Sequence, residues 1–130
     1  MNEKQKNYLK KQNKGIYDNL TAHFNLPIFQ DDLAEDEYPN GYNYFLLIFG
    51  DFESTDSINQ VSQEIYVVYV TEGNDLVDEH TLDILTLISS VPGISFDRSI
   101  KQRLQKKDTD EFLDQVTVIF KRKMSHECKV

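Results

Sequence analysis

The chain has 130 residues, enough for one core, and we expect a single α+β domain over residues 1–130. Its net charge of −8 argues against general binding to nucleic acid or acidic membranes, and it has no apolar run long enough to span a bilayer. The single Cys128 cannot form an internal disulfide, which is typical of a protein from a reducing compartment.

The spacing of apolar residues between Leu9 and Phe24 follows one helical face and predicts a helix over about Glu3–Phe24. The next segment, Asn25–Gly41, has two prolines, many acids and no sustained period. It predicts a long acidic loop.

Two apolar runs, Tyr44–Phe49 and Ile65–Val70, are rich in aromatic and β-branched residues and predict strands. Neither run alternates with polar residues, so both faces of the sheet need cover. A helix on each side of the sheet and a neighbouring copy of the protein both satisfy this need, and the sequence does not separate them. A second helix is expected over Val77–Ser89, ended by Pro92-Gly93.

The last part of the chain predicts a long hairpin, with arms at about Ile94–Leu104 and Phe112–Lys123. In the first arm, every second residue from Ile94 to Leu104 is expected to lie on one face of the strand. This row includes Phe96 and Arg98. The expected fold is therefore a mostly antiparallel four-stranded sheet with two helices, in the order α-β-β-α-β-β, with a long C-terminal hairpin.

No catalytic or cofactor motif accompanies these elements, and we expect no enzyme, no cofactor and no metal. His126-Glu127-Cys128 is the one local cluster of possible metal ligands, and a frayed tail explains it better than zinc. His23 and His80 are expected on solvated surface. A small enzyme whose site is built from residues distant in sequence remains an open alternative.

The charges are segregated along the chain. No Lys or Arg occurs between Gly15 and Asp97, a span with 16 of the 22 acidic residues, so the formal charge divides into −16 there and +8 outside it. Oppositely charged regions of one chain favour head-to-tail contacts between copies, and such contacts form a ring when the rotation closes. We therefore expect self-assembly.

Two charged sets are candidates for interfaces. The first is a basic arm on and after the third strand, where basic side chains either protect a sheet edge or dock on the acidic surface of another copy. It comprises Arg98, Lys101, Arg103, Lys106 and Lys107. The second is an acidic loop, which is expected at an interface or along a channel. It comprises Asp31, Asp32, Glu35, Asp36 and Glu37.

The order of the expected elements can be followed through nearly the whole chain. Ile65–Thr71 leads through Gly73-Asn74-Asp75 into Val77–Ser89, then comes Pro92-Gly93-Ile94 and a hairpin ending at Phe120-Lys121-Arg122-Lys123. This pattern resembles the tail terminator and tail-completion proteins of long-tailed bacteriophages, although no invariant motif carries the resemblance.

The resemblance implies a hexameric ring in the virion tail, assembled in the host cytoplasm, that caps the tail tube and joins it to the head connector. Its partners would be other copies of itself, the tube protein and the connector protein, with DNA only as passing cargo. It carries over no catalytic residues. The alternative is an acidic binding module that mimics nucleic acid and inhibits a DNA-binding protein.

Overall fold

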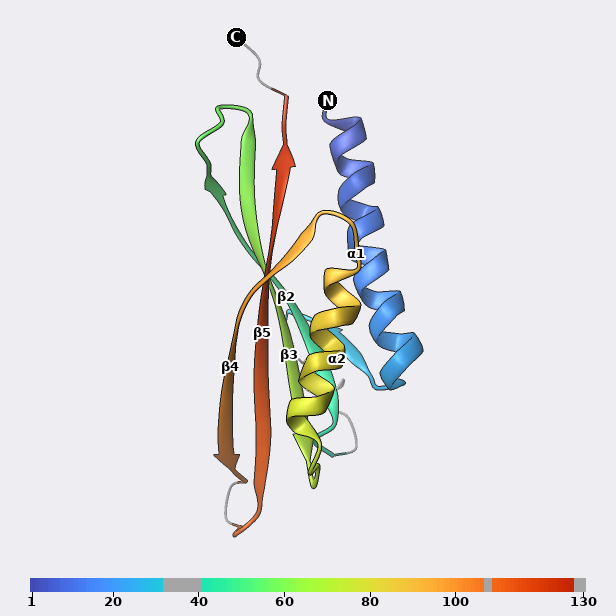
Figure 1. Cartoon of the computed structure of the whole chain (residues 1–130), viewed down its shortest axis with the longest axis vertical. Coiled ribbons are helices and arrows are strands. Elements are labelled where there is room, and N and C mark those ends of the chain that lie inside the picture. Colours follow the sequence, from blue (N-terminus) through green and yellow to red (C-terminus); the bar gives the residue numbers. More distant parts are fainter. Residues whose placement is uncertain (32–40, 107–108, 128–130) are drawn as a thin grey trace.

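The structure is a computed structural model that describes residues 1–31, 41–106 and 109–127. Within these residues the chain forms two helices and five strands (Figure 1). They are α1 (Glu3–Phe24), β1 (Ile28–Gln30), β2 (Tyr44–Ser54), β3 (Gln60–Glu72), α2 (Val77–Ser89), β4 (Ile94–Gln105) and β5 (Phe112–Ser125).

The strands form one five-stranded mixed sheet in the order β1-β2-β3-β5-β4. Strand β1 runs parallel to β2, and the other three pairs are antiparallel. The prediction of a four-stranded antiparallel sheet in the order α-β-β-α-β-β is therefore wrong. Strand β1 has only three residues and follows Pro27 directly, so its pairing with Phe45–Leu47 leaves no periodic signal in the sequence.

Both helices begin and end where the sequence predicts, and the C-terminal hairpin is present. Strands β2 and β3 are longer than expected, because each continues beyond the apolar run into polar residues. These polar extensions form a hairpin that reaches one end of the molecule (Figure 1). Among the described residues, no helix is long and apolar enough to cross a membrane.

Both helices lie on the same face of the sheet. Ile16 and Leu20 of α1 and Ile84 and Ile88 of α2 are fully buried in one cluster with side chains of the three central strands, including Phe45. Full burial of each such side chain contributes about 1.5–3 kcal/mol. A helix on each side of the sheet, one of the two alternatives from the sequence, is therefore wrong.

The opposite face, here called the open face, carries no helix from the described chain. Val68, Val70 and Leu113 form a second cluster there. Towards the sheet edge, Ile100 and Leu104 of β4 are 47% and 41% exposed. The open face is therefore apolar across several strands, which explains why β2 and β3 lack alternation.

A β-bulge interrupts β4. Phe96 pairs with Phe120, whereas Arg98 pairs with Ile119, so one residue, Asp97, is inserted between them. Phe96 and Arg98 consequently lie on opposite faces, and the predicted single row from Ile94 to Leu104 is wrong in its first half.

Candidate functional site

The described residues of the basic arm are divided between the two faces of β4 and are mostly paired with acids of their own chain. Arg98, on the open face, forms an ion pair with Asp97. Lys101, on the helical face, donates to Asp78 of α2 at 2.8 Å, and this hydrogen bond raises the pKa of the Lys101 ammonium. Arg103 lies over the ring of Phe112 with 5.3 Å between its guanidinium carbon and the ring centroid.

Lys106 at the end of β4 joins two acids. Its ammonium pairs with Glu72 at the end of β3 and with Glu111 at 3.0 Å. Hydrogen bonds to Glu72 and then to Glu111 raise the pKa of Lys106, and the same bond from Lys106 lowers the pKa of Glu72. Lys107 lies outside the described residues. Arg98, Lys101 and Lys106 thus form local ion pairs, and the role of the arm as an interface remains a prediction.

Of the acidic loop, only Asp31 lies within the described residues. It follows β1 with a positive φ of 67°, and its backbone N–H donates to the carbonyl of Leu47 at 2.7 Å. This bond extends the β1–β2 pairing by one residue. Asp32, Glu35, Asp36 and Glu37 lie outside the described residues, so the channel interpretation stays a prediction.

Arg122 of β5 is a buried cation with no carboxylate partner in the described chain; it is only 2% exposed. Its guanidinium donates to Gln63 at 2.9 and 2.7 Å and to Asn13 at 2.7 Å, and Gln12 accepts a longer bond at 3.4 Å. The ring of Phe49 lies 5.2 Å from the guanidinium carbon. Burial lowers the pKa of Arg122 to about 10, so it stays charged at neutral pH and links α1 to the sheet through amide oxygens.

A second polar cluster lies where β3 meets α2. The Nδ1 atom of His80 is 3.2 Å from the Tyr69 hydroxyl and 3.0 Å from the Asn74 amide nitrogen. Because an amide NH₂ can only donate, we assign Nδ1 as the acceptor and the ring proton to Nε2. The Asn74 side-chain oxygen accepts from the backbone N–H of Leu76 at 2.8 Å. The Thr71 hydroxyl donates to the side-chain oxygen of Asn43 at 2.9 Å and not to His80. The cluster holds the turn into α2, and the hydroxyl that it places on His80 is the phenol of Tyr69.

Sequence reasoning missed both polar clusters. His80 was expected on solvated surface, yet it is half-buried, and its position four and eight residues before Ile84 and Ile88 places it on the inner stripe of α2. Gln12 likewise lies four residues before Ile16 on the buried stripe of α1. Both residues could have been found from the sequence by applying the helical period to polar residues as well as to apolar ones.

The C-terminal segment is held in place as far as Glu127. The Glu127 carboxylate accepts from the backbone N–H of Asn2 at 2.7 Å, and the Asn2 side chain accepts from the backbone N–H of Glu127 at 2.7 Å. The expectation of a frayed tail is therefore wrong for this residue. Cys128 is outside the described part of the chain, in which no group of three or more possible metal ligands occurs.

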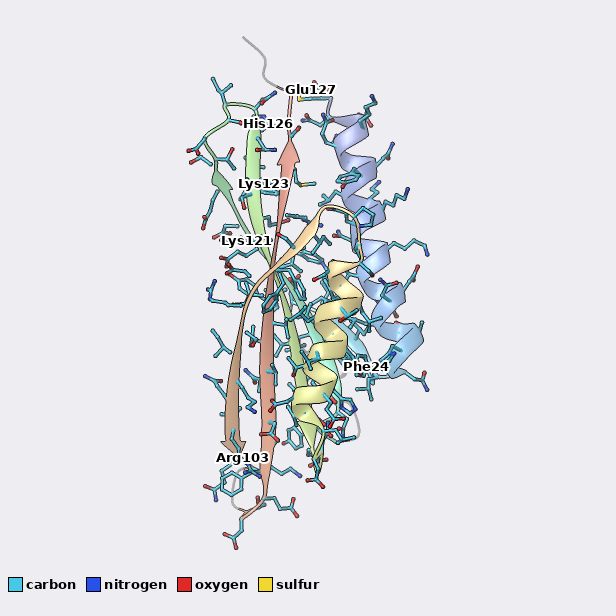
Figure 2. The ribbon with its side chains drawn as sticks, viewed as in Figure 1. Phe24, Arg103, Lys121, Lys123, His126 and Glu127 are labelled. Atoms are coloured by element: carbon cyan, nitrogen blue, oxygen red, sulfur yellow. The ribbon has the colours of Figure 1, made fainter. Side chains whose placement is uncertain are left out.

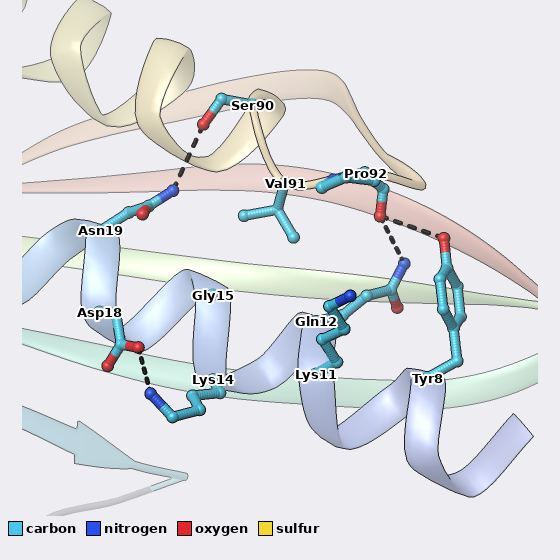
Figure 3. Close-up of a pocket in the computed structure, with 10 residues that line it drawn as sticks. All are labelled: Tyr8, Lys11, Gln12, Lys14, Gly15, Asp18, Asn19, Ser90, Val91 and Pro92. Atoms are coloured by element: carbon cyan, nitrogen blue, oxygen red, sulfur yellow. Dashed lines mark hydrogen bonds and ion pairs between the residues drawn. The ribbon is translucent and has the colours of Figure 1, made fainter. Parts of the chain in front are cut away.

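A cleft of about 480 Å³ lies between α1 and the end of α2 (Figure 3). The Pro92 carbonyl accepts hydrogen bonds from the Tyr8 hydroxyl at 3.2 Å and from the Gln12 amide at 3.0 Å. Lys11 lines the same cleft beside the apolar side chain of Val91. The lining of the cleft also includes the ion pair between Lys14 and Asp18, so it is mixed in charge.

Comparison with known proteins identifies a similar fold. One chain in the solved structure "Virion of native gene transfer agent (GTA) particle" superposes with a TM-score of 0.55 at 13% sequence identity, covering 86% of this chain and 92% of that chain. No protein-family model matches the sequence. No curated protein matches it either. The likeness is one of fold, over nearly the whole length of both chains.

Proposed function

We propose that this protein is a structural component of a phage-like virion, a tail terminator or tail-completion protein that forms a ring, caps the tail tube and joins it to the head connector. The observation that carries the proposal is the fold shared with a chain of the gene transfer agent virion, which is covered over 92% of its length. A match of this extent concerns the whole domain and not one common motif.

The open face supports assembly with other proteins. It presents apolar residues without a helix above them in the described chain, and Ile100 and Leu104 remain substantially exposed. The second cluster is itself buried, so the exposed apolar surface of this face is that of Ile100 and Leu104, which suits a contact with another protein. The proposal gives the protein no catalytic role, and the two polar clusters around Arg122 and His80 act in holding the fold together.

The proposal is tested by tube polymerisation. Purified tail tube protein from the same particle is polymerised with and without this protein, and tube lengths are measured by negative-stain electron microscopy. We expect added protein to shorten the tubes and to appear as a ring at one tube end. Tubes of unchanged length with bare ends would overturn the proposal.

The acidic binding module is not favoured by a specific observation, because four of its five acids lie outside the described residues. Capture of a basic host protein, lost when Asp31, Asp32, Glu35, Asp36 and Glu37 become Asn or Gln, would revive it.

A further inference from the structure

Three segments meet at one end of the molecule: the β2–β3 hairpin, the start of α1 and the end of β5 (Figure 1). The backbone N–H of His126 donates to the carbonyl of Asn59 at 2.8 Å, and Asn2 binds Glu127. Figure 2 shows His126 and Glu127 at this end and Arg103 at the opposite end. These hydrogen bonds fix the hairpin and the helix relative to each other.

The hairpin at this end, residues 51–59, is here called the acidic hairpin. Its acids Asp51, Glu53 and Asp56 are exposed, and none forms an ion pair with a basic residue of the described chain. The same segment exposes two large apolar side chains, Phe52 at 55% and Ile58 at 86%. It therefore presents unpaired negative charge together with apolar surface.

A groove of opposite character lies on the other side of this end, between α1 and the end of β5. This basic groove has a volume of about 410 Å³ and is lined by Lys4, Gln5, Tyr8, Lys123, Met124 and Ser125. Neither of its lysines has an acidic partner among residues 1–31, 41–106 and 109–127. Lys11, which also lacks one there, lies beyond Tyr8 in the cleft of Figure 3.

The acidic hairpin and the basic groove lie at the same height on the sheet but apart from each other. Glu53 pairs with Ser62, and Ser62 pairs with Lys123, so the acid and the base stand in one cross-strand row. They are two strand spacings apart, about 10 Å, and form no ion pair in the described structure. Within one molecule these charges therefore remain unpaired.

We infer that the acidic hairpin of one copy docks in the basic groove of the next copy. The three acids face Lys4, Lys11 and Lys123, and Ile58 and Phe52 pack on the exposed ring of Tyr8. This inference rests on the proposed ring and names its subunit contact. Glu53 of the hairpin and Lys123 of the groove lie in one cross-strand row, so a rotation about the long axis can bring the two surfaces of neighbouring copies together with little translation, which is the condition for a closed ring.

Charge reversal tests the contact. In the groove variant, Lys4, Lys11 and Lys123 are changed to Glu; in the hairpin variant, Asp51, Glu53 and Asp56 are changed to Lys. Each variant alone opposes like charges, so we expect its assembly to weaken at least tenfold in native mass spectrometry and sedimentation velocity. Ile58→Ser is expected to weaken assembly about tenfold without a charge change.

Mixing the two variants gives the sharpest result. Each contact in an alternating arrangement then joins opposite charges, so the mixture is expected to form rings with an even number of subunits. A chain with all six changes restores the attraction in reverse and is expected to assemble alone. Circular dichroism checks that each variant is folded.

The matched control reverses three exposed acids elsewhere, Asp75, Glu79 and Asp110 to Lys, and is expected to assemble as the wild type does. If the wild type forms rings and both variants also do so, this contact is wrong and the proposed function stands. If the variants behave as expected but the wild type forms open filaments or dimers, the contact stands and the ring fails. A wild type that stays monomeric overturns both.

Discussion

At the scale of single residues, the buried guanidinium of Arg122 is the main polar support of α1. Replacing it with Ala leaves the buried amide oxygen of Gln63 and the half-buried one of Asn13 without their donor, and we expect a loss of about 2–4 kcal/mol in the free energy of unfolding. Urea denaturation measures this loss. Lys121→Ala, one residue earlier on the same strand, serves as the control and is expected to change stability by no more than about 0.5 kcal/mol, since its ion pair with Asp97 is long, at 3.7 Å, and exposed.

A double-mutant cycle separates the role of Arg122 from a general effect of a changed core. Gln63→Ala and Arg122→Ala remove the two sides of one interaction, so their effects are expected to be non-additive by about 1–3 kcal/mol. Additivity within about 0.5 kcal/mol would contradict the account of this cluster.

Glu72 gives stability a defined dependence on pH. Its carboxylate is stabilised in the folded state by Lys106 and by the backbone N–H of Tyr42, so its pKa is lowered. A lowered pKa contributes stability that is present above the ordinary glutamate value of about 4.3 and is lost as the pH falls through the folded-state value. Glu72→Gln is therefore expected to be less stable than the wild type near neutral pH and to approach it in acid.

Thermal unfolding of both proteins across the acid range measures this difference. Asp110→Asn, at an exposed position without an ion pair in the described chain, is the control and is expected to show no such convergence. A constant difference between Glu72→Gln and the wild type at all pH values would contradict the assigned pKa direction.

At the scale of elements, alanine substitutions at two glycines separate the free-energy cost of backbone strain from that of disturbed contacts with α1. Gly93 after α2 and Gly73 before it both have positive φ, 88° and 58°. A Cβ at Gly93 would meet the Tyr8 hydroxyl and the Gln12 amide of α1, whereas nothing lies within 4 Å of a Cβ at Gly73. We expect Gly73→Ala to cost about 1 kcal/mol from the backbone alone. Gly93→Ala is expected to cost about 1–3 kcal/mol more, because the Tyr8 and Gln12 side chains must move and lose their hydrogen bonds to the Pro92 carbonyl.

Chemical denaturation of the two variants measures this difference in the free energy of unfolding. Equal losses for Gly93→Ala and Gly73→Ala would show that the hydrogen bonds from Tyr8 and Gln12 to the turn after α2 contribute nothing to stability.

The elements that could be predicted from sequence are those with a repeating signal. The apolar period defined both helices, and alternation at Val116, Val118 and Phe120 defined the inner face of β5. Strand β1 could not be predicted, because three residues contain no period. The bulge at Asp97 is invisible for a related reason, since a one-residue insertion changes the faces without changing composition.

The candidate surfaces could be predicted only in part. The sequence shows that acidic and basic residues are segregated along the chain. It does not show which acids and bases pair in the folded protein. Lys101 and Asp78 are 23 residues apart in sequence and form an ion pair, so the basic arm has little free charge. Unpaired bases lie instead on α1 and at Lys123, although α1 also holds two ion pairs of its own, Lys6 with Glu3 and Lys14 with Asp18.

At the scale of the whole molecule, opposite free charges on two sides of one end predict an assembly sensitive to salt. Between about 0.05 and 1 M NaCl the screening length falls to about 3 Å, so exposed ion pairs between copies weaken. We expect the dissociation constant of the assembly to rise with salt in sedimentation velocity. The groove variant, in which these pairs are absent, is the control and should show a smaller or opposite dependence. An assembly that strengthens with salt in the wild type would indicate contacts made through apolar surface alone.

The central claim is that identical copies of this chain close into a ring, and native mass spectrometry of the wild-type protein from about 1 to 200 µM tests it most directly. The account predicts one discrete oligomer that gains population with concentration and gives ring-shaped particles in negative stain. A monomer at every concentration, or a continuous ladder of growing oligomers, would contradict it.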